Sequence, residues 1–191
     1  MASVLPFDEL NRFNEDLRKR YGMEKQLKKD DLEDILDEML DLFLLAYAQG
    51  NTVTQENLAY LASDKEFRKP KITEVMEVVD AKVAGKTWEE RAKDYFANGG
   101  SVDDIVRIAE TETHRIANTS ALNTAKKVGA KSKTWVTMAD DRVRDTHDYL
   151  EMMTVGIDED FQTYDGDSAS APGLFQLPQN NINCRCELIF S

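Results

Sequence analysis

Residues 101–129 read SVDDIVRIAETETHRIANTSALNTAKKVG, and this stretch gives the clearest helix prediction of the chain. Apolar and small side chains recur along it at three- and four-residue steps, the period of a helix with a buried face. Ser101 is followed three positions later by Asp104, a pattern typical of helix starts, and Gly129 is a typical residue after a helix end. A segment of about 28 residues would form a helix about 42 Å long, with room for a kink near residues 118–120.

Upstream of this helix, residues 1–100 have the pattern of a helical N-terminal region. Helical spacing of apolar side chains covers residues 7–21, 32–47, 54–62 and 72–79. Gly22 follows the first of these stretches and Gly50 the second, so we expect two helices to end there. Thr87 followed by Glu90 is a capping-box pattern, which predicts a further helix that starts after Thr87.

The stretch over residues 32–47 is strongly amphipathic, and Asp30 or Asp31 stands where its N-cap is expected. Its centre carries four consecutive apolar residues, Leu42, Phe43, Leu44 and Leu45. A helix that is apolar most of the way round is buried on more than one side. We therefore expect this helix to be the central helix of the N-terminal region or an oligomer contact.

The pattern changes after Gly129. Strand patterns, rich in β-branched and aromatic residues, cover residues 133–138, 154–157 and 188–190. Residues 140–150 predict a short helix capped by Asp140, and residues 158–181 predict a long loop. The sequence therefore predicts an α+β fold with a mostly helical N-terminal part. Behind it, residues 101–191 are expected to form a small module that combines the long helix with an α+β unit and a short antiparallel sheet.

The composition narrows the functional classes. The chain has 191 residues, with 24 Lys and Arg against 36 Asp and Glu, and a net charge of −12. Proteins that grip duplex DNA by themselves usually carry a basic face, so this balance argues against that role. No apolar run approaches the roughly 18–20 residues of a membrane span, and residues 1–10 do not have the pattern of a secretory signal. No Walker A or dinucleotide-binding glycine pattern occurs, which argues against an ATP-driven motor.

Ten residues near the C-terminus form the constellation that could carry chemistry. They are Trp135, Asp140, Asp141, Arg142, Arg144, His147, Asn183, Cys184, Arg185 and Cys186. One interpretation is structural: the arginines stand among carboxylates, so forked ion pairs could tie the final strand to the helix over residues 140–150. On such a helix Arg144 and Asp148 would be four residues apart and could pair directly.

The second interpretation is a metal site. His147, Cys184 and Cys186 are zinc-ligand types, and a nearby acid, Asp140 or Asp141, could complete a tetrahedron. The final strand is expected to pair with the first strand after the long helix, which would place the two cysteines beside the residue-147 segment. We therefore expect the three candidate ligands to lie close together, with or without zinc.

A nuclease-like enzyme is a further alternative. In it His147 would act as general acid or base, Arg142 or Arg144 would steady phosphate charge, and Asp140 would orient the histidine. The net charge of −12 makes the approach of a polynucleotide unfavourable. The only other histidine, His114, lies mid-helix, where we favour a solvated or inter-domain helix face over a catalytic site.

Over residues 105–188, the order and spacing of these motifs resemble the phage Mu F-like family, also called phage head-morphogenesis proteins. The resemblance rests on the approach helix and on three motifs, Lys-Thr-Trp at 133–135, Asp-Asp-Arg-Val-Arg-x-x-His at 140–147 and Ile-Asn-Cys-Arg-Cys at 182–186. Many relatives resemble a fuller ligand set, with Cys-x-x-Cys at positions 144 and 147 and a histidine at position 181. This chain departs from that set at Arg144 and Asn181.

The resemblance implies a minor head protein, a structural adaptor present in few copies and associated with the portal or procapsid in head morphogenesis, DNA packaging or delivery. It implies phage portal and capsid proteins as partners, contact with packaged DNA at most indirectly, and no membrane. The implied location is the virion head or procapsid, with assembly in the bacterial cytoplasm. Related modules also form the N-terminal part of polymorphic toxins. A second alternative is therefore that this chain is the N-terminal delivery module of such a toxin. We predict a virion component rather than an enzyme.

Overall fold

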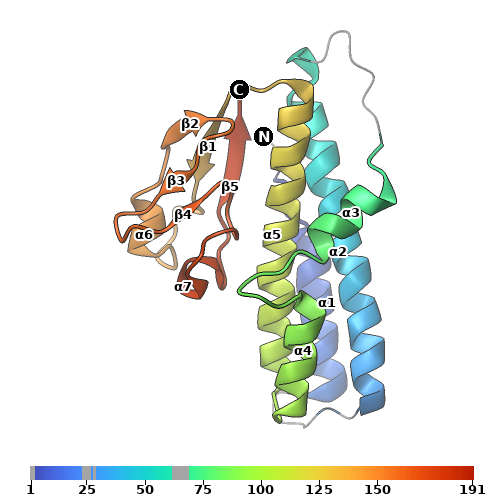
Figure 1. The fold of residues 1–191 in the computed structure, drawn as a ribbon. Helices are drawn as coiled ribbons and strands as arrows, with labels where there is room; N and C mark the ends of the chain where they lie inside the picture. The colour runs from blue at the N-terminus through green and yellow to red at the C-terminus, as the bar shows by residue number, and fades with distance from the viewer. Residues whose placement is uncertain (1–2, 23–26, 28, 62–68) are drawn as a thin grey trace.

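The computed structural model describes residues 3–22, 27, 29–61 and 69–191, and it combines a helical bundle with a small sheet-containing unit (Figure 1). The bundle contains α1 (Phe7–Tyr21), α2 (Lys29–Asn57), the 3₁₀ turn η1 (Ala59–Leu61), α3 (Ile72–Val79), α4 (Trp88–Ala97) and α5 (Val102–Val128). The C-terminal unit, residues 132–190, contains β1 (Ser132–Val136), α6 (Asp145–Asp148), β2 (Thr154–Gly156), β3 (Phe161–Gln162), β4 (Ser168–Ala169), α7 (Pro178–Asn181) and β5 (Glu187–Phe190). This arrangement confirms the predicted α+β class.

Helix α5 lies between the two parts of the molecule, with bundle helices on one side and the sheet on the other (Figure 1). It runs without interruption from Val102 to Val128, and a capping box joins Ser101 and Asp104 at its start, as predicted. Gly129 follows its end with a φ of 91°, a left-handed conformation that glycine adopts without strain. Because neighbours cover both sides of α5, many of its polar side chains are buried together with the apolar ones.

The other long element, α2, differs from the prediction at both ends. It begins at Lys29, so the N-cap expected at Asp30 or Asp31 is wrong. It also continues past Gly50 to Asn57 and absorbs part of the stretch that was expected to form a separate weak helix. The two predicted helices are therefore one.

The packing of α2 explains why it does not end at Gly50. A Cβ atom added at Gly50 would stand 2.3 Å from the carbonyl oxygen of Ala117 on α5, so the glycine permits a close approach of two helices. Phe43 is fully buried and meets Trp88 edge-on, with ring centroids 5.0 Å apart. The interior position expected for this helix is confirmed at Phe43, although Leu45 is 41% exposed.

The main sheet has the strand order β2-β1-β5, and both outer strands run antiparallel to β1. Trp135 on β1 is the register partner of Leu188 on β5, so the predicted pairing of the final strand is confirmed. Residues 158–181, expected as a loop, contain the paired strands β3 and β4 and the short helix α7.

The short helix predicted over residues 140–150 is reduced to the single turn α6, which begins at Asp145. Arg144, not Asp140, occupies its N-cap position. The physical reason is that both carboxylate oxygens of Asp140 accept hydrogen bonds from the guanidinium of Arg185, which draws this side chain toward the segment before β5.

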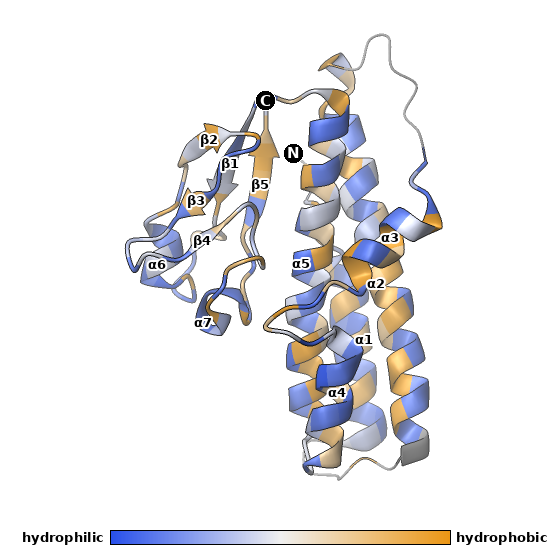
Figure 2. Ribbon diagram, viewed as in Figure 1, coloured by the Kyte–Doolittle hydropathy of each residue, from blue (hydrophilic) through white to orange (hydrophobic). Residues whose placement is uncertain are grey.

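Hydrophobic and hydrophilic residues form separate bands along the bundle helices (Figure 2), as expected for helices that bury one face. Within the described residues, none of the helices has both the length and the apolar character needed to cross a bilayer.

Candidate functional site

The C-terminal unit brings His147, Cys184 and Cys186 into one buried cluster. The Nδ1 atom of His147 lies 3.6 Å from the Sγ atom of Cys184 and 3.4 Å from the Sγ atom of Cys186. The three candidate ligand atoms all lie within 4.8 Å of one another, and the residues are only 2%, 3% and 4% exposed. The juxtaposition expected from the strand pairing is therefore present.

Two parts of the C-terminal unit position this cluster. Helix α6 carries His147, and the two cysteines occupy the segment that leads into β5, which is fixed by its pairing with β1. Residues two apart in an extended segment point to the same side, so Cys184 and Cys186 can both face the imidazole. Asn183, directly before them, has a φ of 56°, a conformation that asparagine tolerates better than most residues.

Aromatic rings enclose the imidazole of His147. The fully buried Trp135 meets it edge-on at 5.3 Å between ring centroids, and Phe175 stacks on it at 5.4 Å. Phe161 does not stack on the imidazole but packs against Trp135, with ring centroids 5.2 Å apart. Trp135 is thus a core residue that fixes the orientation of the histidine.

The two thiols differ in their affinity for a proton. Hydrogen bonds, first with Cys186 and then with His147, hold the pKa of Cys184 well below its usual range. The pKa of Cys186 is raised, because this thiol is hydrogen-bonded to Cys184 and is itself buried. The pair therefore favours a thiolate at Cys184, and the thiolate is the form of cysteine that binds metal ions.

Two polar side chains of α5 hold the backbone of the cysteine segment. Nδ1 of His114 donates to the carbonyl oxygen of Cys184, and Nδ2 of Asn118 donates to that of Cys186 at 3.0 Å. His114 is 5% exposed, and burial lowers its pKa. Of the two expected alternatives, a solvated or an inter-domain helix face, the structure has the second, since the C-terminal unit covers this face of α5. The anchoring role of Asn118 was not recognised from the sequence, although it lies one helical turn after His114.

A second polar network joins α5 to two other helices of the bundle, α3 and α4. Nε of Arg115 lies 2.7 Å from a carboxylate oxygen of Glu112, and both side chains are 1% exposed. Arg115 also donates to the carbonyls of Val78 and Val79 at the end of α3, and Arg91 on α4 binds the other oxygen of Glu112. This network links three helices, which is a structural role.

A forked ion pair ties the segment after β1 to the segment before β5. Two nitrogen atoms of Arg185 lie 2.8 and 2.7 Å from the two carboxylate oxygens of Asp140. Hydrogen bonding to Arg185 lowers the pKa of Asp140 to about 2. Arg142 reaches the same carboxylate at 3.6 Å. The expected tie between these two segments is therefore present, through Arg185 and Asp140.

The other predicted ion pairs are not formed. Arg144 instead donates to the carbonyl oxygens of Gln179 and Ile182, because its extended backbone at the start of α6 lets its side chain reach α7. Across the described ranges, no arginine forms an ion pair with Asp141, Asp145 or Asp148.

The nuclease-like interpretation is not supported by this geometry. It required Asp140 to orient His147, but Nδ1 of His147 faces the two sulfur atoms and the carboxylate of Asp140 is bound to Arg185. His147 is also only 2% exposed, so its ring is not presented on an open surface.

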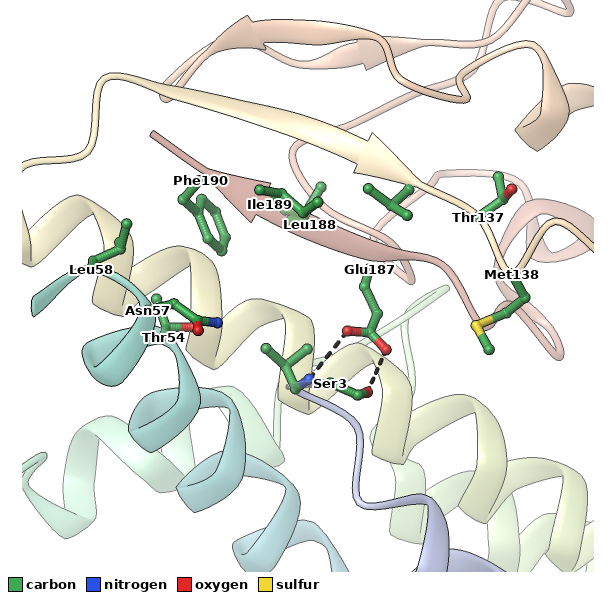
Figure 3. A pocket seen from close by; sticks show the side chains of 12 residues that line it. Ser3, Thr54, Asn57, Leu58, Thr137, Met138, Glu187, Leu188, Ile189 and Phe190 are labelled. Atoms are coloured by element: carbon green, nitrogen blue, oxygen red, sulfur yellow. Dashed lines mark hydrogen bonds between the residues drawn. The ribbon is translucent and has the colours of Figure 1, made fainter. Parts of the chain in front are cut away.

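A cavity of about 230 Å³ lies where the N-terminal segment and the end of α2 meet β1 and β5 (Figure 3). The carboxylate of Glu187 accepts hydrogen bonds there from the backbone of Val4, at 3.1 Å, and from the hydroxyl of Ser3. The lining contains none of the ten motif residues, so this junction is separate from the histidine–cysteine cluster.

Comparison with known proteins gives one family match and two similar curated proteins. The family model described as Phage Mu protein F like protein matches residues 72–189, from the start of α3 into β5. Minor head protein GP7 of Bacillus phage SPP1 is 36% identical over 86 residues, which cover 43% of this chain and 28% of that protein.

The second similar protein is NAD(+)--arginine ADP-ribosyltransferase EFV of Enterococcus faecalis (strain ATCC 700802 / V583). It is 31% identical over 149 residues, which cover 60% of this chain and 30% of the enzyme. The chain thus spans less than a third of the length of either relative. No solved structure matches the chain.

Proposed function

This chain belongs to the Phage Mu protein F like family, and we propose that it is a minor head protein that joins portal and capsid proteins as a structural adaptor. The observation that carries this proposal is the family match over residues 72–189, together with the similarity to the minor head protein of phage SPP1. The match supports a phage head protein. Attachment to the portal, with a part in DNA packaging or delivery, is the finer step that we infer.

The contacts of the motif residues support a structural role. Arg185 binds Asp140, Arg144 binds two backbone carbonyls near α7, and Trp135 is enclosed in the core of the C-terminal unit. These side chains hold one segment of the chain against another. Arg144 and Arg185 also line a cavity of about 530 Å³, but their side-chain nitrogen atoms are bound to other segments of the chain.

We assign the docking surface to the helical bundle. Tyr60 in the 3₁₀ turn η1 and Ile72 at the start of α3 are each 66% exposed. Large apolar side chains on the surface are candidates for protein contacts when they act together. The C-terminal unit would then stabilise and orient the bundle through α5, which both parts share.

Co-purification tests the docking proposal. The chain is co-expressed with the portal protein, and separately with the capsid protein, of the genome that encodes it. We expect a stable complex with the portal, weakened in the double variant Tyr60→Ser, Ile72→Ser. The matched control changes two equally apolar and exposed residues of the C-terminal unit, Met152→Ser and Tyr164→Ser, which are 64% and 60% exposed.

If the chain co-purifies with neither the portal protein nor the capsid protein, the adaptor role is contradicted. If the complex is lost in the control variant Met152→Ser, Tyr164→Ser and kept in the variant Tyr60→Ser, Ile72→Ser, the docking surface lies on the C-terminal unit instead. The same proposal places the protein in the virion head or procapsid after assembly in the bacterial cytoplasm. Detection of the chain in purified procapsids and finished heads checks that location.

The similarity to an ADP-ribosyltransferase favours a second candidate, a delivery module of a larger toxin. The matched region covers only 30% of that enzyme, so the likeness extends to a minority of its length. In this reading too, the described chain carries no catalysis of its own. We expect no transfer of ADP-ribose from NAD⁺ to an arginine substrate by the purified chain, and measurable transfer would overturn the non-enzymatic assignment.

A further inference from the structure

We propose that His147, Cys184 and Cys186 bind one zinc ion that fastens α6 to the start of β5. This inference is independent of the docking partner, because it rests on a cluster inside the C-terminal unit. The three residues are of the types that bind zinc, and all three are buried. Among the described residues this is the one group of potential ligands gathered so closely.

The distances within the cluster fit a tetrahedral zinc site. Zinc bonds of about 2.3 Å to sulfur and about 2.0–2.1 Å to nitrogen place sulfur and nitrogen ligands of one tetrahedron about 3.6 Å apart. The two distances from Nδ1 of His147 to the cysteine sulfur atoms are 3.6 and 3.4 Å. Each sulfur atom therefore already stands at the separation from Nδ1 that a shared ion requires.

The surroundings hold these ligands in place. His114 and Asn118 fix the carbonyls of the two cysteines, and Trp135 and Phe175 fix the plane of the imidazole. Partners that orient the ligands are typical of protein metal sites. Two thiolates would balance the charge of a divalent ion, so the bound ion adds no net charge to the buried site.

The fourth position belongs to a water molecule. Asp140, one of the acids considered for it, is engaged by Arg185, and Asp141 is exposed and lies outside the ligand group. A cavity of about 10 Å³ adjoins the cluster, lined in part by Met138 and Arg142. That space is about what one water needs and is far below the size of a substrate. We therefore assign the ion a structural function, although most structural zinc sites have four protein ligands.

Zinc ligation would contribute directly to the stability of the C-terminal unit. The cluster joins residues 37 and 39 positions apart in the sequence, on the two sides of the segment that carries β2, β3, β4 and α7. Binding energy gained only in the folded state adds to the folding free energy. A single helical turn such as α6 is too short to be stable by itself, so its stability depends on contacts of this kind.

The proposal is tested first on the unmodified chain. The full chain is purified in zinc-supplemented buffer without chelators, and its metal content is measured by mass spectrometry. We expect about one zinc per chain, a lower melting temperature after chelation, and recovery when zinc is added back. Cobalt(II) added to the stripped chain should give the visible ligand-field bands and the sulfur-to-cobalt charge-transfer band of a tetrahedral thiolate site.

Variants identify the ligands. Cys184→Ser, Cys186→Ser and His147→Gln should each lose the bound zinc and the cobalt bands. Phe161→Leu is the matched control, because it loosens the same core through Trp135 without removing a ligand, and it should keep the zinc while its melting temperature falls. A metal-free chain that shows no cobalt bands, and whose melting temperature does not respond to zinc or chelator, would overturn the proposal even if every ligand variant failed to fold.

Discussion

Gly50 on α2 and Ala117 on α5 touch backbone to backbone: a Cβ atom at position 50 would stand 2.3 Å from the carbonyl oxygen of Ala117. Gly50→Ala would improve the intrinsic helix propensity of α2. We nevertheless expect it to destabilise the protein by about 1–3 kcal/mol, the usual cost of overpacking, because the obstructing atoms are backbone and cannot rotate away.

Urea unfolding measures this effect, with Thr52→Ala on the exposed side of the same helix as the control. The control should change stability by no more than about 0.5 kcal/mol. If Gly50→Ala is as stable as the original chain, α2 and α5 do not cross as closely as described.

Removal of the buried carboxylate of Glu112 should lower the free energy of unfolding more than Gly50→Ala does. Glu112→Ala leaves the guanidinium of Arg115, 1% exposed, without its charged partner in the core. Breaking one side of a buried ion pair costs about 3–5 kcal/mol. Glu89→Ala removes an exposed carboxylate, paired with Lys93 on α4, and should have little effect in the same unfolding experiment. Equal losses in the two variants would contradict the structural importance of the buried network.

The sequence predicted most helices well because their boundaries are local. The capping boxes at Thr87 and Ser101 use residues three positions apart, and both are present in the structure. The end of α2 was mispredicted because a glycine that permits helix contact looks the same in the sequence as a glycine that follows a helix end. Only the position of Ala117, 67 residues away, distinguishes the two.

The sequence predicts which residues form the candidate site, but not which side chains hold them in place. The pairing of β1 with β5 could be inferred from strand patterns, and it brings Cys184 and Cys186 toward His147. The burial of His114 depends on the C-terminal unit covering the second side of α5, which no local pattern reports. Likewise Asp140 stands where a helix cap is expected, and only the folded chain brings its distant partner Arg185 beside it.

The fork between Asp140 and Arg185 predicts a loss of stability in acid. The folded-state pKa of Asp140 is lowered to about 2, below its ordinary value of 3.8. A lowered carboxyl pKa contributes stability above the unfolded value, and that contribution is lost as the pH falls from about 4 toward 2. Asp140→Asn should therefore melt at a lower temperature than the original chain at pH 6, and the difference should close near pH 2.

Asp141→Asn is the control for that pH series, because Asp141 is exposed and has no arginine partner within the described chain. It should show no comparable gap at any pH. A gap for Asp140→Asn that persists unchanged to pH 2 would mean that the fork does not depend on the charge of the carboxylate.

The isolated chain should bind duplex DNA weakly. Its net charge is −12, and the arginines of α1 that could form a basic face are already paired: Arg12 with Glu9, Arg18 with Asp103, and Arg20 with Asp16 and Glu38. Affinity for DNA comes largely from cations that are free to neutralise phosphates. Fluorescence anisotropy at about 150 mM salt should show no sub-micromolar binding, and a tight complex would require a basic surface that the pairing of these arginines does not provide.

The burial of Lys133 predicts that its contribution to the stability of the folded chain increases at alkaline pH. This side chain of β1 is fully buried, donates to the carbonyl of Ser170 at 2.7 Å and lies over the ring of Phe161. Burial lowers its pKa to about 8 from an ordinary value of 10.5. Below pH 8 the lysine is charged in both states, so the folded chain carries the whole cost of burying the charge. Between pH 8 and 10.5 the folded chain releases the proton first, and the stability contributed by this group rises.

The comparison of the original chain with Lys133→Met isolates that contribution, because the other titrating groups are common to both. Methionine keeps much of the side-chain length without a charge. We expect the stability of the original chain, relative to the variant, to rise as the pH increases from 7 to 10.5, by at most about 3 kcal/mol for a shift of this size. Urea unfolding at closely spaced pH values measures the difference, and parallel curves across this range would show that Lys133 does not lose its proton before the chain unfolds.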